Sequence, residues 1–351
     1  MNPAFVVRFR PLGPWRIGLH AGARDRVDRV FHSDALFSAL STAMLRLGRL
    51  EQWLDATVRH PEGPCVALSS CFPYIEETHF VPPPRTMWPP PASPKVRWSN
   101  ARFVPLAAAQ DLVAGRSLSE DSWYVDGPSG CLLPEDAHFH SGPFRTVTRS
   151  HAAVDRIRTG AIEIHRTACL EFAPYSGLWA VVRFSDEAAR DEWSKPVQGA
   201  LRLLADTGLG GERSLGWGRS DEPEFLEGDL PGLILGSSQP KAVNGEEPVE
   251  TAYWLLSLFN PSPEDAVDWR RGGYSLVTRG GRVESPAGSG DSKKLVRMVE
   301  EGSVLAAARD PRGSARDVAP EGFPHPVYRA GFAVAIPIPL RAPERAAGNV
   351  L

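Results

Sequence analysis

Residues 207–220 combine closely spaced glycines with arginines, a pattern that suits the binding of phosphate. Five glycines fall within eleven residues, and Arg213 and Arg219 lie among or beside them. Glycine lets a backbone bend sharply or approach another backbone closely. Consecutive amides in such a turn can form an anion-binding concavity, which arginines can close. The spacing is that of neither a P-loop nor a dinucleotide-binding loop, so it predicts a loop for an extended phosphodiester or a purely structural turn.

Histidines are the candidates for catalysis. Cleavage of RNA without a metal needs a general base and a general acid, usually histidine, and His20, His32 and His151 are available. A structural or RNA-contacting histidine is the commoner case, so we predict no catalytic residue. Of the carboxylates that a metal nuclease would use, only Asp34 and Asp155 sit in motif-like settings, and helix capping and hairpin-turn formation explain these two. We predict no metal and no cofactor. The full set of carboxylates is Asp28, Asp34, Glu76, Glu77 and Asp155.

Composition predicts a cytoplasmic globular protein. The chain has 351 residues, enough for two domains, with 42% hydrophobic residues and a net charge of −3. No apolar run approaches the roughly 20 residues of a membrane span, and no secretion signal is seen. The four cysteines lack any C-x-x-C spacing, so buried thiols are favoured over a zinc site at Cys131, His138 and His140. The net charge does not exclude nucleic acid, because binding depends on local patches.

The first part of the chain reads as strand, helix, strand, insertion, strand, helix, strand. His32-Ser33-Asp34 opens the helical run 35–48, where Ser33 suits the cap, Asp34 suits the helix dipole and Gly48 ends the helix. A second helix, 187–206, is expected to be interrupted at Pro196. This order of elements is that of a ferredoxin-like or RRM-type fold. The strands are expected at 4–10, 65–75, 178–184 and 217–225.

Two inserted segments carry basic residues. One is rich in proline around residues 82–94 and is flanked by Arg85, Trp88 and Trp98, a mixture that suits single-stranded nucleic acid or a solvated loop. The other alternates over 144–158 and 161–172, which predicts a long hairpin that turns near Thr159-Gly160. Its basic residues would let it protrude over a nucleic-acid backbone. They include Arg145, Arg149, His151, Arg156, Arg158, His165 and Arg166.

A Gly-, Pro- and Ser-rich stretch, 228–247, separates a second unit. We therefore expect domains at 1–228 and 250–351. In the second domain we expect strands at 253–259 and 274–279, a helix that begins near Pro263-Glu264, and further strands to residue 340.

Several peptides resemble the RAMP superfamily of CRISPR proteins. They are FHSDALFSAL (31–40), FPYIEETHFVPPPR (72–85), HAAVDRIRTGA (151–161), GLGGERSLGWGR (208–219), SLFNPSPED (257–265), LVTRGGRVES (276–285), KKLVRMVEEGSV (293–304) and GFPHPVYRAG (322–331). The nearest resemblance is to the 5′-handle-capping subunit of the Csm-type, type III-A effector complex. The resemblance implies an α+β fold with two ferredoxin-like (RRM-like) domains, inserted loops and a projecting β-hairpin.

The resemblance also implies a function. Such a subunit is not an enzyme: it binds the repeat-derived 5′ tag of crRNA, contacts target RNA indirectly, and links the large polymerase-palm signature subunit to the backbone RAMP subunit. The RNA-binding residues carried over are His32, Ser33, Asp34, Arg149, His151, Arg156, Gly208, Gly210, Gly211, Arg213, Ser214, Gly216, Gly218 and Arg219.

Three matters stay open at the level of sequence. Two functions remain as alternatives to binding of the crRNA tag. One is a metal-independent endoribonuclease that processes the CRISPR transcript, and the other is an assembly scaffold that contacts protein but not RNA. Either 85–103 or 145–170 is the hairpin that enters the guide–target duplex. The tag bases that are read are not specified.

Overall fold

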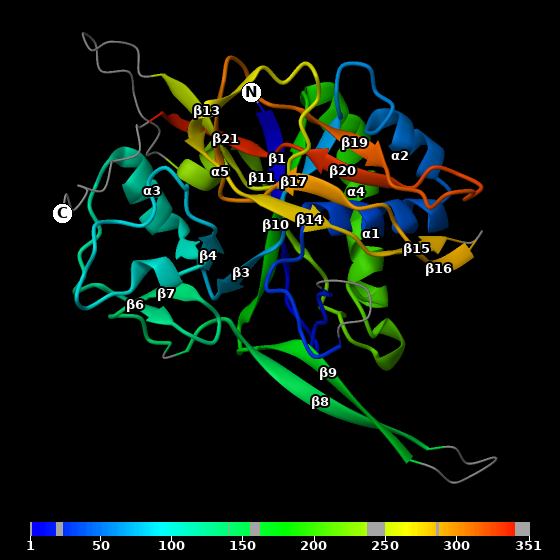
Figure 1. Ribbon diagram of the computed structural model, residues 1–351, viewed down its shortest axis with the longest axis horizontal. Helices are drawn as coiled ribbons and strands as arrows, with labels where there is room; N and C mark the ends of the chain where they lie inside the picture. The colour runs from blue at the N-terminus through cyan, green and yellow to red at the C-terminus, as the bar shows by residue number, and fades with distance from the viewer. Residues whose placement is uncertain are drawn as a thin grey trace, which may run out of the picture.

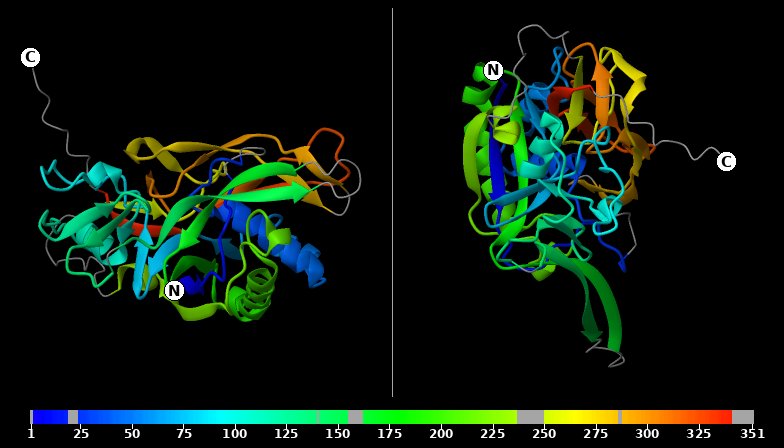
Figure 2. Two further views of the ribbon diagram at one scale, coloured as in Figure 1. Left: turned by 90° about the horizontal axis from the view of Figure 1, so that it is seen from below. Right: turned by 90° about the vertical axis from the view of Figure 1, so that its left-hand side faces the viewer.

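The computed structural model describes residues 2–18, 24–139, 141–154, 162–236, 250–285 and 288–340. Within these ranges two antiparallel sheets form adjacent layers, with helices on the N-terminal half and a long hairpin that extends from the body (Figures 1 and 2). No helix in the described ranges has both the length and the apolar character needed to cross a bilayer.

The larger sheet belongs to the N-terminal half. Its two central strands, β1 and β10, pair along their length with Val6 opposite Val181, and every residue of β10 is buried. A run of apolar residues without alternation is typical of a strand that is covered on both faces. The strand order is β11-β1-β10-β3-β4-β5, and β2 also pairs with β10. The bounds are β1 (Asn2–Phe9), β2 (Val66–Leu68), β3 (Phe72–Ile75), β4 (Thr78–Val81), β5 (Val104–Pro105), β10 (Ser176–Phe184) and β11 (Glu224–Leu230).

Helix α1 (Ser33–Arg46) packs against α4 on one side and against β20 of the C-terminal half on the other. Leu36, Leu40 and Met44 recur at helical spacing and are buried. The predicted cap is wrong: His32 occupies the N-cap position and Ser33 is the first helical residue. Gly48 follows the helix with a φ of +69°, which fits the predicted helix end.

Helix α4 (Glu187–Thr207) runs without a break, so the predicted interruption at Pro196 is wrong. A proline inside a helix removes one backbone hydrogen bond. Here one face of the helix is buried along its length, which compensates for that loss. The helix is capped by Asp186, whose carboxylate accepts a hydrogen bond from the Ala189 amide at 2.8 Å.

The insertion between β4 and β10 contains the predicted hairpin. Strands β8 and β9 pair over eleven residues each, and the outer end of this hairpin projects away from the body (Figure 2). The segment 85–103 is instead folded onto the body. The remaining elements of this half are α2 (Leu50–Ala56), η1 (Trp98–Asn100), α3 (Leu106–Ala114), β6 (Trp123–Asp126), β7 (Cys131–Pro134), β8 (Phe144–Val154), β9 (Ile162–Phe172), η2 (Arg213–Leu215) and α5 (Gly232–Leu235).

The C-terminal half is formed by strands alone among its described residues, 250–285 and 288–340. A four-stranded sheet has the order β13-β18-β12-β21, and three further strand pairs, β14-β17, β15-β16 and β19-β20, complete this half. The bounds are β12 (Thr251–Leu255), β13 (Val267–Gly273), β14 (Leu276–Arg279), β15 (Arg282–Ser285), β16 (Gly288–Ser292), β17 (Val296–Val299), β18 (Val304–Ala307), β19 (Gly313–Asp317), β20 (Tyr328–Phe332) and β21 (Ala335–Pro339).

The helix expected near Pro263-Glu264 is therefore wrong, and a turn occupies its place. Asp265 holds this turn: its carboxylate accepts hydrogen bonds from the amides of Ser262 (2.8 Å), Arg312 (2.7 Å) and Gly313 (3.0 Å). An aspartate that binds nearby backbone amides favours a turn over a helix.

The two halves share one hydrophobic core. A single cluster of buried residues includes strands of the N-terminal sheet together with Trp254 and Phe332 of the C-terminal half. Phe37 of α1 packs edge-on against Phe332, with ring centroids 5.8 Å apart. The Trp254 indole donates a hydrogen bond to the Pro82 carbonyl at 3.2 Å. The halves are thus joined by apolar packing as well as by the linker.

Candidate nucleic-acid interface

The residue that precedes α1, His32, is buried in a charged cluster between the halves. Its Nδ1 lies 2.8 Å from Glu301 and its Nε2 lies 3.2 Å from Asp28. Burial alone would lower the pKa of His32, but the negative charge of Glu301 and hydrogen bonds to both carboxylates raise it to about 9. Glu301 is also hydrogen-bonded to the Ser70 hydroxyl. His32 is therefore an imidazolium whose two ring N–H groups are both used within the protein.

Asp34, two residues after His32, forms a second buried cluster. Arg279 donates two hydrogen bonds to its carboxylate, at 3.0 and 3.1 Å, and Arg329 contacts the same group. Burial raises the pKa of Asp34, but the two guanidinium groups outweigh burial and lower the pKa to about 2. Both arginines come from the C-terminal half, so this cluster also joins the halves.

Ser33 lies between these clusters and is buried as well. Its amide donates to the Ser70 hydroxyl at 2.8 Å, and its own hydroxyl oxygen accepts from the Leu258 amide at 3.0 Å. The three residues predicted at the helix start are thus brought together by the fold. The hydrogen bonds and ion pairs of these three residues fix the position of the C-terminal half relative to α1. Their contact with RNA stays a prediction.

The Gly-rich loop follows α4 and closes on itself and on the segment 14–16. The amides of Leu209, Gly211 and Gly218 donate to the carbonyls of Gly218, Arg16 and Pro14, at 2.9 to 3.0 Å. These amides therefore do not form the anion-binding concavity that the sequence suggests.

Glycine is required at three points of this loop: at Gly208, where a Cβ would lie 2.6 Å from the Trp217 carbonyl oxygen, and at Gly210 and Gly218. At Gly210 a side chain would place its Cβ 2.3 Å from the Arg16 carbonyl oxygen, and at Gly218 it would lie 2.0 Å from the Leu209 carbonyl oxygen. Both residues have a φ near +80° to +85°. In contrast, Gly216 has open space where a Cβ would be. The predicted close approach of two backbones is correct, and the partly exposed stretch 210–216 is left as the face of the loop.

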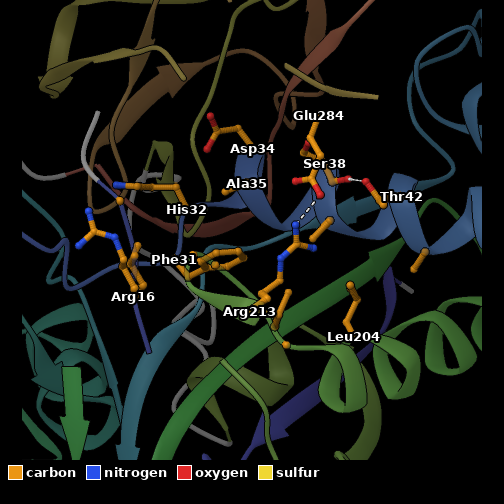
Figure 3. A pocket seen from close by; sticks show the side chains of 18 of the residues that line it. Arg16, Phe31, His32, Asp34, Ala35, Ser38, Thr42, Leu204, Arg213 and Glu284 are labelled. Carbon is orange, nitrogen blue, oxygen red and sulfur yellow. Dashed lines mark hydrogen bonds and ion pairs between the residues drawn. The ribbon is translucent and has the colours of Figure 1, made fainter. Parts of the chain in front are cut away.

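A cleft of about 320 Å³ lies between this loop, α1 and the C-terminal half (Figure 3). His32 and Asp34 line its inner wall, and Gly208, Gly210, Gly211 and Arg213 line its rim. The lining is strongly basic: six Arg or Lys side chains face two carboxylates. The basic residues are Arg16, Arg46, Arg213, Arg279, Lys293 and Arg329, and the acidic residues are Asp34 and Glu284.

Sequence reasoning missed the cleft residues Arg16, Arg46 and Lys293. Lys293 lies mostly buried, and burial, together with the nearby charge of Arg329, lowers its pKa. Among the described residues no carboxylate lies within ion-pair distance of its ammonium group. The more distant carboxylates of Asp34 and Glu284 act in the opposite direction and do not outweigh burial. A partly desolvated basic group in a cleft, with no carboxylate in direct contact, is a candidate for binding an anion. Its position within KKLVRMVEEGSV was the only signal that the sequence offered.

Arg213 is the predicted loop residue that points across the cleft. Its guanidinium group pairs with the carboxylate of Glu284 in β15, as the dashed line in Figure 3 marks. The pair is exposed, with 32% of the Arg213 side chain and 66% of the Glu284 side chain accessible. Ser214, Gly216 and Arg219 are exposed on the same loop.

The predicted hairpin residues lie apart from the cleft. Arg149 is exposed on β8 and pairs with Glu171 at 2.9 Å, while the His151 ring packs against Trp217 of the Gly-rich loop with centroids 5.5 Å apart. His151, the eighth of the eleven residues of β8, therefore links the hairpin to the loop well beyond its base. Arg156 lies outside the described residues, as do His20, His140, Asp155, Arg158 and the turn at 159–160.

The aromatic residues of the proline-rich segment are structural. Trp98 and Phe103 are buried, and Trp88 packs edge-on against Trp98 at 6.0 Å. Trp98 and Phe103 are therefore not available as a platform for stacked bases, whereas Trp88 is partly exposed and its contact with nucleic acid stays a prediction.

No group of three or more His, Cys, Asp or Glu among the described residues has the arrangement of a metal site. Cys131 is fully buried, and burial raises the pKa of its thiol. His138 is instead exposed and paired with Glu76 at 2.7 Å.

Comparisons with known proteins show what this chain is similar to. Residues 249–338 match the family model of the CRISPR Csm4 C-terminal domain. A relative in Thermococcus onnurineus (strain NA1), described as "CRISPR system Cms protein Csm4", is 24% identical over 97% of this chain and 99% of its own length.

Solved structures show the same fold. A chain of the Csm3-Csm4 subcomplex in the type III-A CRISPR-Cas interference complex superposes with a TM-score of 0.60 at 17% identity, covering 97% of this chain and all of that chain. A chain of the Csm1-Csm4 cassette in complex with cA4 gives a TM-score of 0.55 at 18% identity, covering 98% and 100%. The fold is thus an α+β fold found in type III-A CRISPR complexes. With the family model and the relative, these structures confirm the resemblance to the Csm-type RAMP subunit: the chain is similar to Csm4 along nearly its whole length.

Proposed function

We propose that the chain is a non-catalytic subunit of a type III-A CRISPR interference complex that binds the 5′ repeat-derived tag of crRNA. It would link the large signature subunit to the backbone RAMP subunit and act in the cytoplasm. The resemblance supplies the partners: relatives with this fold occur with Csm1 and with Csm3. The observation that carries the RNA site is the basic cleft, which has the Gly-rich loop as its rim and Lys293 inside it.

The strand orders support two ferredoxin-like units, 1–228 and 250–351. Numbered along the chain, the four main strands of each half lie in the order 4-1-3-2, as β11-β1-β10-β3 and as β21-β12-β18-β13. In the second unit strand pairs replace the helices of the ferredoxin-like pattern. The cleft would then lie along the seam between two such units.

The chemistry of the cleft favours binding over cleavage. A general base needs a free lone pair near the ribose hydroxyl, and both nitrogens of His32 are already donors to carboxylates. The single strand of the tag would be held mainly through its phosphates, with base contacts adding identity. The hairpin β8–β9 is the segment we assign to the guide–target duplex, because it alone of the two candidates projects from the body.

Photo-crosslinking tests this function. The chain would be co-expressed with the large and backbone subunits of its own locus and a guide RNA whose tag carries photoreactive nucleotides. We expect crosslinked peptides from 208–219 and from the segment that contains Lys293. Crosslinks only outside the cleft would contradict the tag site, and the absence of any RNA crosslink to this chain would favour a protein-only scaffold.

Salt dependence gives a second test. A lysine that neutralises one phosphate of a single strand contributes a slope of about −0.7 in log K against log salt. Lys293→Gln should therefore flatten this slope by about 0.7. Lys195 is the control, because it lies on the exposed face of α4 and outside the cleft. Lys195→Gln should leave the slope unchanged. Equal slopes for the Lys293→Gln variant and the unaltered chain would exclude this lysine from the site.

Incubation of the purified chain with repeat RNA in EDTA tests the enzymatic alternative. We expect intact RNA. A defined product that disappears in His32→Ala or His20→Ala would establish an endoribonuclease instead.

A further inference from the structure

Glu284 occupies an unusual place in an otherwise basic cleft. It is one of two carboxylates in the lining, and the other, Asp34, is saturated by two buried arginines from the C-terminal half. Glu284 instead lies at the exposed mouth of the cleft, on β15, and pairs with the one arginine that the Gly-rich loop directs across it (Figure 3). The pair joins residues 71 positions apart in the chain, one from each half.

The pair has no evident structural role that would require it. Both side chains are solvent-accessible, and exposed ion pairs contribute little to stability. The loop itself is already fixed by its backbone hydrogen bonds to residues 14–16 and by its glycine contacts. The carboxylate therefore stands where a phosphate oxygen would be expected to meet Arg213, because guanidinium groups bind carboxylate and phosphate in similar geometry.

We propose that Glu284 is a built-in competitor for RNA phosphate at Arg213, which holds this arginine in a neutral pair until guide RNA displaces it. The inference rests on the proposed function and adds a regulation of the same site. An Arg–Glu pair has no net charge, so it neutralises no phosphate. A phosphate that takes Arg213 leaves the Glu284 carboxylate beside it. RNA without further contacts in the cleft is thus disfavoured, whereas RNA that also binds Lys293 and Arg46 gains enough from those contacts to displace Glu284.

The test is the salt dependence of RNA binding by the purified full chain, measured by fluorescence anisotropy. The probes are a labelled guide RNA with its 5′ tag and an unrelated RNA of equal length. Glu284→Gln keeps the shape of the side chain and removes its charge. A carboxylate then no longer offsets the charge of Arg213 when a phosphate binds it, whether or not that phosphate displaces Glu284 in the unaltered chain. At about 0.1 M salt one further contact of this kind raises the affinity about 5-fold and steepens the slope by about 0.7. Both probes should show this change.

Two controls separate the competitor from a general loss of negative charge. Glu250→Gln removes a carboxylate from another exposed Arg–Glu pair, that with Arg271, which does not line the cleft, and it should change neither affinity nor slope. In an Arg213→Gln background, Glu284→Gln should leave the slope unchanged, because no arginine remains to be freed. Thermal unfolding of each variant verifies that the fold is intact.

The outcomes distinguish this inference from the proposed function. If Lys293→Gln flattens the slope but Glu284→Gln has the slope of the unaltered chain, the cleft binds RNA and the competitor is refuted. The competitor role of Glu284 is also refuted if Glu284→Gln steepens the slope equally in the unaltered chain and in the Arg213→Gln variant. If neither Lys293→Gln nor Glu284→Gln alters binding, or the chain binds neither RNA, the tag site itself fails.

Discussion

At the scale of single residues, Asp34 is the side chain on which the seam between the halves depends most. Asp34→Asn keeps its shape but leaves Arg279 and Arg329 close together in the interior without a counter-charge. Removing one partner of a buried ion pair typically lowers the free energy of unfolding by about 3–5 kcal/mol. We expect a loss of that order in urea denaturation.

A matched exposed carboxylate provides the control for this prediction. Asp221 pairs with Arg10 at 2.7 Å on the surface, and Asp221→Asn should have a much smaller effect. Similar losses in the two variants would mean that the buried cluster is not special.

His32 predicts a dependence of stability on pH. Its pKa of about 9 in the folded protein lies above its ordinary value of 6.5, so its contribution is complete below pH 6.5 and is lost as the pH rises toward 9. The free energy of unfolding should fall by up to about 1.4 kcal/mol per pH unit across that window. Urea denaturation at a series of pH values measures it.

Asp34 acts at the opposite end of the pH scale. Its pKa of about 2 lies below the ordinary 3.8, so its contribution to stability is lost as the pH falls through that range.

The exposed His138 gives the control for the loss of stability between pH 6.5 and 9 that is predicted from His32. His138→Gln should leave that loss in place. A stability that stays flat between pH 6.5 and 9 would contradict the assignment of a buried imidazolium.

At the scale of elements, the Gly-rich loop separates structural glycines from an exposed one. Gly210→Ala would force a Cβ to within 2.3 Å of a carbonyl oxygen, and we expect it to lower the free energy of unfolding by about 2 kcal/mol or more. Gly216→Ala meets no neighbour and bears only the cost of a positive φ, about 1 kcal/mol. Chemical denaturation of both variants checks the ranking, and a larger loss for Gly216→Ala would show that the loop is not closed in this way.

The elements also show what the sequence can and cannot predict. Alternation along β8 and β9 and the apolar run of β10 predict those strands correctly, because their pattern is local. The helix expected at Pro263 fails because a turn held by Asp265 uses backbone amides from residues 312 and 313, which lie far along the chain.

The same limit applies to the candidate site. The residues His32, Ser33 and Asp34 stand out in the sequence, but the groups that bury them, Glu301, Arg279 and Arg329, are 245 to 295 positions away. No local pattern reports such a pairing. Lys293 escaped notice for the same reason, because its desolvation depends on the packing of both halves.

At the scale of the whole molecule, the shared core predicts that the halves depend on each other. Trp254 and Phe332 are buried in one cluster with the N-terminal sheet, and Glu301 pairs with His32. Residues 250–351 expressed alone would expose these groups to water, and we expect a protease-sensitive product without a cooperative unfolding transition. Co-expression with residues 1–236 should restore protease resistance. A cooperative transition in the isolated segment would instead support an autonomous domain.

The outer end of the hairpin β8–β9, beyond the contact of His151 with Trp217, projects from the body (Figure 2). Residue pairs can therefore be added or removed near its tip while the core keeps its packing. Each added pair extends the arm by about 3.4 Å and, because successive side chains alternate, turns the outermost residues to the opposite side, and a second pair turns them back. In related chains, the number of added pairs can thus set the length of the hairpin, and an odd or even number sets the side to which its outermost side chains point. Neither change alters the fold that carries the hairpin.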